Sequence, residues 1–518
     1  MSQQPVRNQR QYDFIVVSNR LPVDSVIDGD GNQAWAPSPG GLVAALEPVM
    51  HRHDGAWVGW PGRADLDLDP FDTDGMSLIP VPLSEAEVAD YYEGFSNATL
   101  WPLYHDVIAV PEFLREWWET YRVVNRRFAE RTAEVAAPGA VVWVQDYQLQ
   151  LVPKLLRDAR PDLTIGFFNH IPFPSYGLFS QLPWRTQIIE GLLGADVVGF
   201  QRDADAGNFA QAVRRLKGFA TKGQHIAVPL TDPNPGRRAS GPVREDGPTR
   251  TVVARKFPIS IDAPYFRATS HREDIRARAN EIRADLGNPK VIMLGVDRLD
   301  YTKGIRHRLL AYGELLAEGR VKPEEVILVQ VASPSRERVK SYMDLRDEVE
   351  VTVGRINGEY SAIGHQAISY HHHSYPREEM VALYLAADVM LVTALRDGMN
   401  LVAKEYVAAQ VDLDGVLILS EFAGAAHQMK QAVLVNPFDV RGLEAAMDEA
   451  VNGDRKVHRR RMALLRRAVF RDDAAWWARE FLDALERRSD PPPPPVPGSS
   501  DTGATHADPI GSGLVGRA

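Results

Sequence analysis

The sequence predicts an α/β protein built from two doubly wound parallel sheets. Its 518 residues exceed what one ordinary core supports, so two large domains are expected. Short apolar, β-rich runs alternate with longer helix-forming runs in both halves, which is the pattern of parallel βαβ units. Polar or glycine-containing turns follow several of these runs, and ligand sites of parallel sheets lie at such strand ends.

The composition narrows the class of protein. A hydrophobic content of 44% and a charged content of 25% are those of a soluble globular chain. The chain has no cysteine, which excludes disulfides, thiolate nucleophiles and thiolate zinc sites and fits a cytoplasmic protein. The net charge of −10 argues against a nucleic-acid partner. No apolar run approaches the ~18 residues of a membrane span, and the polar N-terminus lacks a signal-peptide core. We therefore expect no membrane partner.

The first half of the chain opens with a predicted strand over 13–17, followed by Ser18-Asn19-Arg20-Leu21-Pro22. Gly40 and Gly41 then start a predicted helix that runs to about Met50. Glycines at a helix start allow the backbone to approach a phosphate or sugar, although a Gly-Gly pair is more often only a turn. Further strands are predicted over 141–145, 163–168, 196–200 and 251–261.

Asp146 and His170 each follow one of these strands, where ligands of parallel sheets gather. That position favours a functional role for His170 over a structural core histidine. An aromatic-rich segment over 91–101 contains Tyr92 and Trp101. Such rings can stack on sugars, but they more often belong to the core.

Two patterns that could indicate a metal are rejected. Asp65, Asp67 and Asp69 alternate with leucines, but they do not end a strong apolar strand, so a solvated loop is predicted. The run 371–373 consists of three adjacent histidines, whose side chains cannot easily converge on one ion. We therefore predict neither a metal site nor a cofactor.

The second half carries predicted strands over 291–299, 326–332, 389–393, 415–420 and 432–435. Arg298 and Lys303 stand five residues apart across the turn after the first of these and form a plausible phosphate clamp. Arg336 follows the second strand.

The segment from Val389 to Gln410 predicts a buried strand, a sharp turn and a helix. Such a turn gathers free backbone N–H groups and the positive end of a helix dipole. Asp397 and Gly398 in the turn suit a polyhydroxylated or phosphorylated ligand, and Glu405 lies about one helical turn beyond Leu401. The alternative is an ordinary turn with a capping aspartate.

The predicted domains meet near 262–264, where Asp262-Ala263-Pro264 forms a hinge. We expect a disordered N-terminus over 1–12, one domain over 13–262 and a second over 263–488. A last helix over 472–487 is expected to pack back on the first domain. The tail 489–518, with five consecutive prolines at 491–495, is expected to be disordered.

Taken together, these motifs resemble those of the trehalose-6-phosphate synthases, in family order from about Phe14 to about Leu485. The resemblance rests on Ser18 to Pro22, Gly40-Gly41-Leu42, Tyr92 to Trp101, Gln145-Asp146-Tyr147, His170 to Pro174, Asp297 to Gly304 and Arg396 to Leu401. Asn169 and Ser175-Tyr176-Gly177 depart from the usual pattern.

The resemblance implies a GT-B fold, with two Rossmann-like domains facing a cleft, and retaining transfer of glucose from a nucleotide-glucose to glucose 6-phosphate. It also implies a homo-oligomer, a tetramer or a dimer. His170, Asp397, Arg298 and Lys303 would be catalytic. The implied donor-binding residues are Gly40, Gly41, Arg298, Lys303, Asp397, Gly398, Met399, Asn400, Leu401, Val402, Ala403, Lys404 and Glu405. The implied acceptor-binding residues are Arg20, Tyr92, Trp101, Asp146 and Arg336.

Two alternatives stay open at the level of the sequence. One is another sugar transferase of the same fold, and the other is a non-catalytic homologue that senses a sugar phosphate. The resemblance also leaves the donor base open between ADP-glucose and UDP-glucose, because base recognition depends on backbone and pocket shape.

Overall fold

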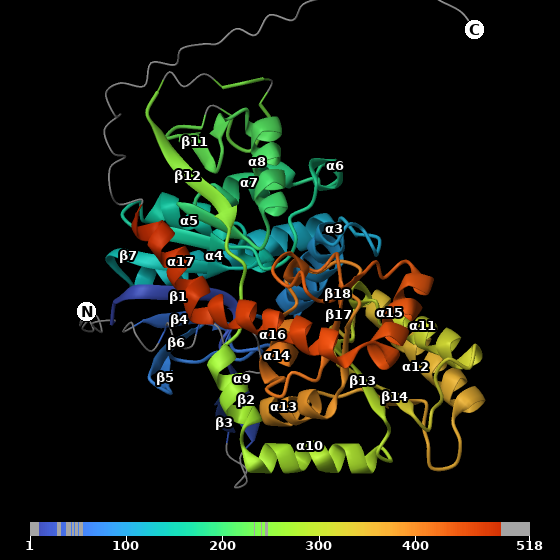
Figure 1. Ribbon diagram of the computed structural model, residues 1–518. Helices are drawn as coiled ribbons and strands as arrows, with labels where there is room; N and C mark the ends of the chain where they lie inside the picture. The colour runs from blue at the N-terminus through green and yellow to red at the C-terminus, as the bar shows by residue number, and fades with distance from the viewer. Residues whose placement is uncertain are drawn as a thin grey trace, which may run out of the picture.

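The computed structural model describes residues 10–27, 33–37, 43, 46, 50, 55–232, 234–239, 241–243 and 247–487. Within them, two large sheets form, one from each half of the chain (Figure 1). The predicted α/β class with two parallel-sheet domains is confirmed. The Gly40-Gly41 turn, residues 1–9 and the tail 489–518 lie outside the described residues.

The N-terminal sheet has ten strands in the order β10-β11-β12-β9-β8-β7-β1-β4-β6-β5. The strands from β12 to β6 in this order are parallel, and antiparallel strands close both edges. The bounds are β1 (Tyr12–Arg20), β4 (Ala56–Trp60), β5 (Phe71–Thr73), β6 (Met76–Pro80), β7 (Ala136–Gln145), β8 (Thr164–Phe168), β9 (Val197–Phe200), β10 (Thr221–Lys222), β11 (His225–Pro229) and β12 (Thr249–Lys256), with a separate hairpin of β2 (Val23–Ile27) and β3 (Gln33–Pro37).

The helices of this half include a π-helical segment, η1, which leads directly into the short helix α3. Their bounds are α2 (Glu85–Glu87), η1 (Val88–Leu100), α3 (Trp101–Tyr104), α4 (Arg115–Val135), η2 (Tyr147–Leu149), α5 (Val152–Ala159), α6 (Tyr176–Phe179), α7 (Arg185–Leu192) and α8 (Asp203–Lys217).

The C-terminal sheet is entirely parallel, in the order β15-β14-β13-β16-β17-β18. Its strands are β13 (Val291–Arg298), β14 (Val326–Ser333), β15 (Ile368–His371), β16 (Val389–Val392), β17 (Val416–Ser420) and β18 (Val433–Val435). Its helices are α9 (Ala263–Ser270), α10 (Glu273–Asp285), η3 (Tyr301–Lys303), α11 (Ile305–Ala317), α12 (Lys340–Tyr360), α13 (Arg377–Ala386), α14 (Leu401–Ala409), η4 (Gly424–His427), α15 (Val440–Asn452), α16 (Arg455–Arg471) and α17 (Ala474–Glu486).

Strand order in each sheet reverses at one point. The chain moves outward from β1 to β4 and β6 on one side, and later adds β7, β8 and β9 on the other. In the second sheet it moves from β13 to β14 and β15, and then returns to β16, β17 and β18. Loops diverge at such a switch point and leave a crevice at the strand ends, where ligands bind. The β1/β7 and β13/β16 strand ends are therefore the expected positions of a ligand site.

The last helix crosses back to the N-terminal sheet (Figure 1). In α17, Phe481 stacks on Trp143 of β7 at 4.4 Å between ring centroids, and Trp477 lies edge-on to Phe168 of β8 at 5.2 Å. Gly166 and Gly199 make room for Phe481, because a Cβ on either would come within 2.6 and 2.8 Å of its ring.

The connection between the domains is irregular where a strand over 251–261 was predicted. β12 ends at Lys256, because Pro258 has no N–H for the ladder. The backbone N–H of Ile259 instead bonds Gln201, and the carbonyl of Ile261 accepts from Ala474 at the start of α17.

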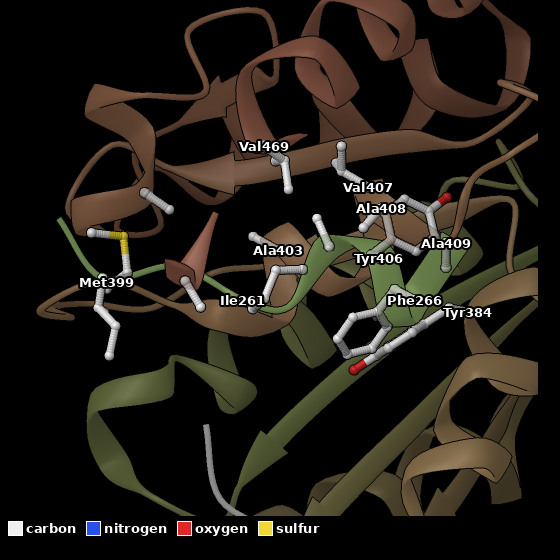
Figure 2. Close-up of a cluster of buried hydrophobic side chains, with 14 of the residues drawn as sticks. Ile261, Phe266, Tyr384, Met399, Ala403, Tyr406, Val407, Ala408, Ala409 and Val469 are labelled. Carbon is white, nitrogen blue, oxygen red and sulfur yellow. The ribbon is translucent and has the colours of Figure 1, made fainter. Parts of the chain in front are cut away.

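Helix α14 is fixed by its buried face. Figure 2 shows Ala403, Tyr406 and Val407 of this helix gathered with Ile261 and Val469, which belong to the interdomain connection and to α16. The helix that follows the Asp397 turn is thus seated in the main core of the molecule. No helix among the described residues is long and apolar enough to span a bilayer.

Candidate functional site

Lys303 and Asp397 bring together the two strand ends of the C-terminal switch point. Lys303 follows β13 and Asp397 follows β16, and Lys303 Nζ donates to Asp397 Oδ2 at 2.6 Å. Their side chains are only 11% and 13% exposed, so water screens the pair little. Burial alone would raise the pKa of Asp397, but the charge and hydrogen bond of Lys303 outweigh it and lower that pKa. The Asn400 amide also donates to the carboxylate, at 3.2 Å.

Arg298 and Arg336 of the C-terminal domain both lie against the indole ring of Trp101. The guanidinium carbon of Arg336 is 3.9 Å from the indole centroid, and that of Arg298 is 5.3 Å away. Both distances suit cation–π attraction. Trp101 is 4% exposed, and its indole N–H has no hydrogen-bond partner among the described residues.

Arg336 is buried between the domains with few groups of opposite charge. It donates to the Tyr147 hydroxyl at 3.1 Å, to Asp300 Oδ2 at 3.4 Å and to the Tyr342 hydroxyl. Its side chain is 3% exposed, and within the part of the chain that the structure describes its Nε has no hydrogen-bond partner. Its φ of 50° is unusual for a residue with a Cβ. Burial raises the pKa of Asp300, but Arg336, Arg298 and Lys303 outweigh this and lower it to about 2.

Asp146 and His170 are joined at the neighbouring ends of β7 and β8. The backbone N–H of His170 donates to Asp146 Oδ1 at 3.1 Å, and His170 Nε2 lies 2.9 Å from the amide oxygen of Gln145. Burial raises the pKa of Asp146 to about 6 and lowers that of His170 to about 3, so the imidazole is neutral at physiological pH. Asp146 has a φ of 71°, so it is a second non-glycine residue of the site, after Arg336, with a positive φ angle.

The two domains touch at Gly398. A Cβ on this residue would lie 2.1 Å from the carbonyl oxygen of His170, so only glycine fits there. Gly424 packs on the other side, because its Cβ would lie 1.9 Å from the Gly398 carbonyl oxygen. The position that a Cβ of residue 398 would take is thus filled by the main chain of the other domain.

The residues after Gly398 divide between the site and the core. Met399 and Ala403 are buried, and the Asn400 side chain caps α14 by accepting from the Ala403 N–H at 3.0 Å. Leu401 and Val402 are half-buried. Glu405 accepts from the Tyr384 hydroxyl at 2.8 Å, and burial raises the pKa of Glu405.

Lys404 points away from the turn. Its Nζ donates to the carbonyl of Ile259 and to Gln428 Oε1, both at 2.7 Å, and the residue is 1% exposed. Burial lowers the pKa of Lys404 to about 7. Its side chain therefore ties α14 to the interdomain connection.

Arg20 and Tyr92 lie around a second aromatic residue, Trp60. The Arg20 guanidinium carbon is 5.8 Å from the Trp60 ring, and the Tyr92 ring centroid is 6.2 Å from it. Gly62 is packed against the Arg20 guanidinium, since a Cβ there would approach it within 2.0 Å. The side chain of Arg20 is thus held at the end of β1. Gly40 and Gly41 lie outside the described residues.

The structure also shows where the two sequence patterns that were rejected as metal sites lie. The aspartates at 65, 67 and 69 are exposed in an irregular loop. His371 lies 2.8 Å from Ser369 Oγ and 3.1 Å from the Tyr375 hydroxyl, in the wall of a cavity of about 560 Å³ between α10, α13, β14 and β15. The described residues contain no group of three His, Asp or Glu that could hold a metal ion.

Sequence reasoning missed several residues of this site. Asp300 and Tyr147 stand only as parts of motifs in the sequence, yet they bind Arg336. Gln145 contacts His170. The charges of Lys303 and Asp397 act on the pKa of His105. Tyr342 carried no signal, because it lies in a helix far from any motif.

Comparisons with known proteins agree with this geometry. The family model described as glycosyltransferase family 20 matches residues 12–487. A trehalose-6-phosphate synthase of Mycobacterium avium is 57% identical over 477 residues, which cover 91% of this chain and 95% of that protein. Two solved structures, each 31% identical with a TM-score of 0.80, cover 91% and 92% of this chain and 99% of their own. One is an alpha,alpha-trehalose-phosphate synthase (UDP-forming) from Burkholderia xenovorans in complex with glucose-6-phosphate, and the other is an E. coli protein bound with UDP-2-fluoro glucose.

Proposed function

The chain belongs to glycosyltransferase family 20 and is a glycosyltransferase of the trehalose-6-phosphate synthase type, and from this premise we propose its substrates and the roles of its residues. The reaction is transfer of glucose from a nucleotide-glucose to glucose 6-phosphate, with retention at the anomeric carbon. The products are α,α-trehalose 6-phosphate and a nucleoside diphosphate, which serve trehalose biosynthesis and osmoprotection.

The observation that carries this proposal is the arrangement around the C-terminal switch point. Lys303 and Arg298 supply fixed positive charge beside the carboxylate of Asp397, and Arg336 reaches into the same region over Trp101. A diphosphate leaving group needs cations, a sugar needs hydrogen-bond acceptors, and a sugar phosphate needs a second cationic group.

In the proposed mechanism, the C–O bond between glucose and the diphosphate breaks as the acceptor hydroxyl approaches from the same face. The anomeric carbon develops positive charge, and the leaving diphosphate gains negative charge. Arg298 and Lys303 stabilise that negative charge electrostatically without a metal. The departing phosphate oxygen accepts the proton of the acceptor hydroxyl, so neither a carboxylate nucleophile nor an enzyme base is used.

The remaining residues would position the two sugars. Asp397 and the backbone of residues 398–401 accept and donate to the hydroxyls of the transferred glucose, and Glu405 takes the ribose hydroxyls. Arg336 and Arg20 bind the acceptor phosphate, with Tyr92, Trp101 and Asp146 around the acceptor ring. His170 lies beside the transferring glucose, and its neutral ring adds no positive charge next to the developing cation.

The proposed substrates have support from the relatives. The Burkholderia xenovorans structure is described as a complex with glucose-6-phosphate, and the E. coli structure as bound with UDP-2-fluoro glucose. The donor base is proposed as uracil or adenine, and rates with UDP-glucose and ADP-glucose at equal concentration will decide between them.

The function is tested by a single-turnover assay of nucleoside diphosphate release, with and without glucose 6-phosphate, followed by identification of the sugar product. Release that depends on glucose 6-phosphate and gives a non-reducing disaccharide phosphate supports the proposal. Release that depends instead on a glucan or on another sugar phosphate indicates a different transferase. Binding without release indicates a sensing protein.

A further inference from the structure

The segment that links α3 to the following loop holds a histidine that no motif assigned. His105 is 1% exposed, and its ring lies 4.2 Å from the Trp101 ring between centroids. Its Nδ1 is 2.8 Å from the backbone carbonyl of Trp101. A carbonyl oxygen can only accept, so Nδ1 carries the proton, and a neutral ring then leaves a lone pair on Nε2.

The ring is neutral in this position. Burial is the main cause that lowers the pKa of His105, to about 3. The bond to the Trp101 carbonyl and the charge of Asp300 raise this pKa by less, and the smaller effects of Lys303 and Asp397 have opposite signs. The charges that act on His105 are therefore those of Asp300, Lys303 and Asp397 in the candidate site.

The backbone after His105 is strained. Asp106 and Val107 have φ angles of 56° and 59°, although neither is glycine and Val107 is β-branched. A β-branched residue in the left-handed region is rare and strained, and such strained residues gather at functional sites. The segment is also held across the domain boundary, because Arg396 Nε lies 3.0 Å from Asp106 Oδ2. Arg396 directly precedes Asp397, so this contact fixes His105 relative to the turn.

We propose that His105 is a further substrate-binding residue, whose Nε2 accepts a hydrogen bond from a hydroxyl of the sugar held between Trp101 and Asp397. The inference rests on the proposed function, since it requires a sugar at that place. Within the described part of the chain, His105 makes no hydrogen bond through Nε2. A lone pair on a neutral ring selects a hydroxyl donor and gives no attraction to a phosphate.

Two substitutions separate this role from a structural one. In His105→Asn the amide nitrogen can replace Nδ1 and keep the bond to the Trp101 carbonyl, but nothing replaces Nε2. In His105→Gln the longer side chain places its amide oxygen near the position of Nε2. A structural role predicts that Asn substitutes at least as well as Gln, whereas the proposed role predicts the reverse.

We expect His105→Asn to lower kcat/KM by about 10- to 100-fold, and His105→Gln to retain activity within about 5-fold of the wild type. Both variants are compared at matched folded fraction, measured by near-UV circular dichroism and thermal melting. Equal activity of the Asn variant and the wild type, or a Gln variant as impaired as the Asn variant, would overturn the proposal.

Deoxy substrates then identify the hydroxyl. Deoxy analogues of UDP-glucose and glucose 6-phosphate, each lacking one hydroxyl, are assayed with the wild type and with His105→Asn. The analogue that lacks the hydroxyl bound by Nε2 should lose activity with the wild type but lose little more with the variant, because the two changes remove the same bond. Equal proportional losses for every analogue would contradict a direct contact.

Failure of the two proposals can be told apart. The product made by the wild type tests the proposed function. The ratio between the Asn and Gln variants tests His105 with whichever glucose transfer the wild type catalyses.

Discussion

Lys303 and Asp397 neutralise each other across the C-terminal switch point, with 2.6 Å between Nζ and Oδ2. In the proposed reaction they have different ligands, the donor diphosphate for Lys303 and the glucose hydroxyls for Asp397. Each residue can change its partner without leaving the other as an isolated buried charge, because the incoming donor carries both kinds of group. The pair thus keeps the site stable in the absence of substrate.

The first prediction concerns this pair. Asp397→Asn should lower turnover by at least about 100-fold, because a charged hydrogen-bond acceptor is lost and the reacting carbon is displaced. Asp397→Ala should also lose about 3 kcal/mol in the free energy of unfolding, because it leaves the Lys303 charge buried and unpaired. Steady-state kinetics and urea denaturation of both variants measure the two effects. Turnover close to the wild type in folded Asp397→Asn would rule out the assigned role.

The second prediction concerns recognition of the acceptor phosphate. Arg336→Ala and Arg20→Ala should each reduce kcat/KM for glucose 6-phosphate by roughly 10- to 150-fold, with little change in donor KM. The double variant should lose less than the product of the two factors, because both residues bind one group. Arg338→Ala is the matched control, since Arg338 lies nearby in the sequence with a side chain that is 64% exposed. If a variant loses donor binding as strongly as it loses activity with glucose 6-phosphate, the substituted arginine belongs to the nucleotide site.

The third prediction concerns the contact between the domains. Gly398→Ala would place a methyl group 2.1 Å from the His170 carbonyl oxygen, so the domains must separate or the turn must shift. We expect a loss of about 1–3 kcal/mol in stability and a larger loss in turnover. Gly358→Ala in α12 is the control, because a Cβ there would meet no described atom within 4 Å beyond its own stretch of helix. Wild-type kinetics for Gly398→Ala would show that the close approach does not matter for the reaction.

The fourth prediction is a pH dependence of stability. Burial lowers the pKa of folded Lys404 to about 7, whereas the unfolded side chain titrates at ~10.4. Between these values the unfolded chain binds more protons, so the free energy of unfolding from this group rises with pH. From pH 7 to pH 9 the wild type should gain up to about 2 kcal/mol relative to Lys404→Met. Urea denaturation at both pH values tests this, and parallel pH dependences would refute it.

The fifth prediction concerns metal ions. Activity in excess EDTA should exceed half of that with Mg²⁺, because Arg298 and Lys303 supply the charge that a metal would otherwise supply. Replacing Asp65, Asp67 and Asp69 together by asparagine should leave both rates unchanged, since these side chains are exposed in a loop. Complete loss in EDTA that Mg²⁺ restores would show that a metal takes part.

The sequence predicted the strand–turn–helix around Asp397 closely. β16 covers the predicted strand 389–393 except for its last residue, and α14 ends one residue before the end of the predicted segment at Gln410. These features are local, since apolar runs and turn residues determine them. The packing of Gly398 against His170 could not be predicted, because His170 lies in the other domain. Periodicity also could not place the Lys404 side chain, whose partners belong to the interdomain connection and to a distant loop.

His105 illustrates a second limit. In the sequence it follows an aromatic segment that suggests core packing, and its position in the site depends on the positive φ angles of Asp106 and Val107. Val107 is β-branched and disfavours that conformation, so tertiary contacts such as that between Arg396 and Asp106 are needed to hold the turn. Rules based on residue preferences cannot anticipate such a turn.

The packing of α17 against Trp143 and Phe168 has a consequence for biosynthesis. A ribosome releases the N-terminal half first, and most domains can fold as soon as they emerge. Here the helix that covers part of the N-terminal sheet is encoded at residues 474–486, so that sheet stays incompletely covered until nearly the whole chain has been synthesised. During this interval Gly166, Gly199 and the aromatic rings around them form an apolar surface that chaperones could recognise. An N-terminal fragment ending at the hinge should therefore aggregate unless α17 is supplied in trans.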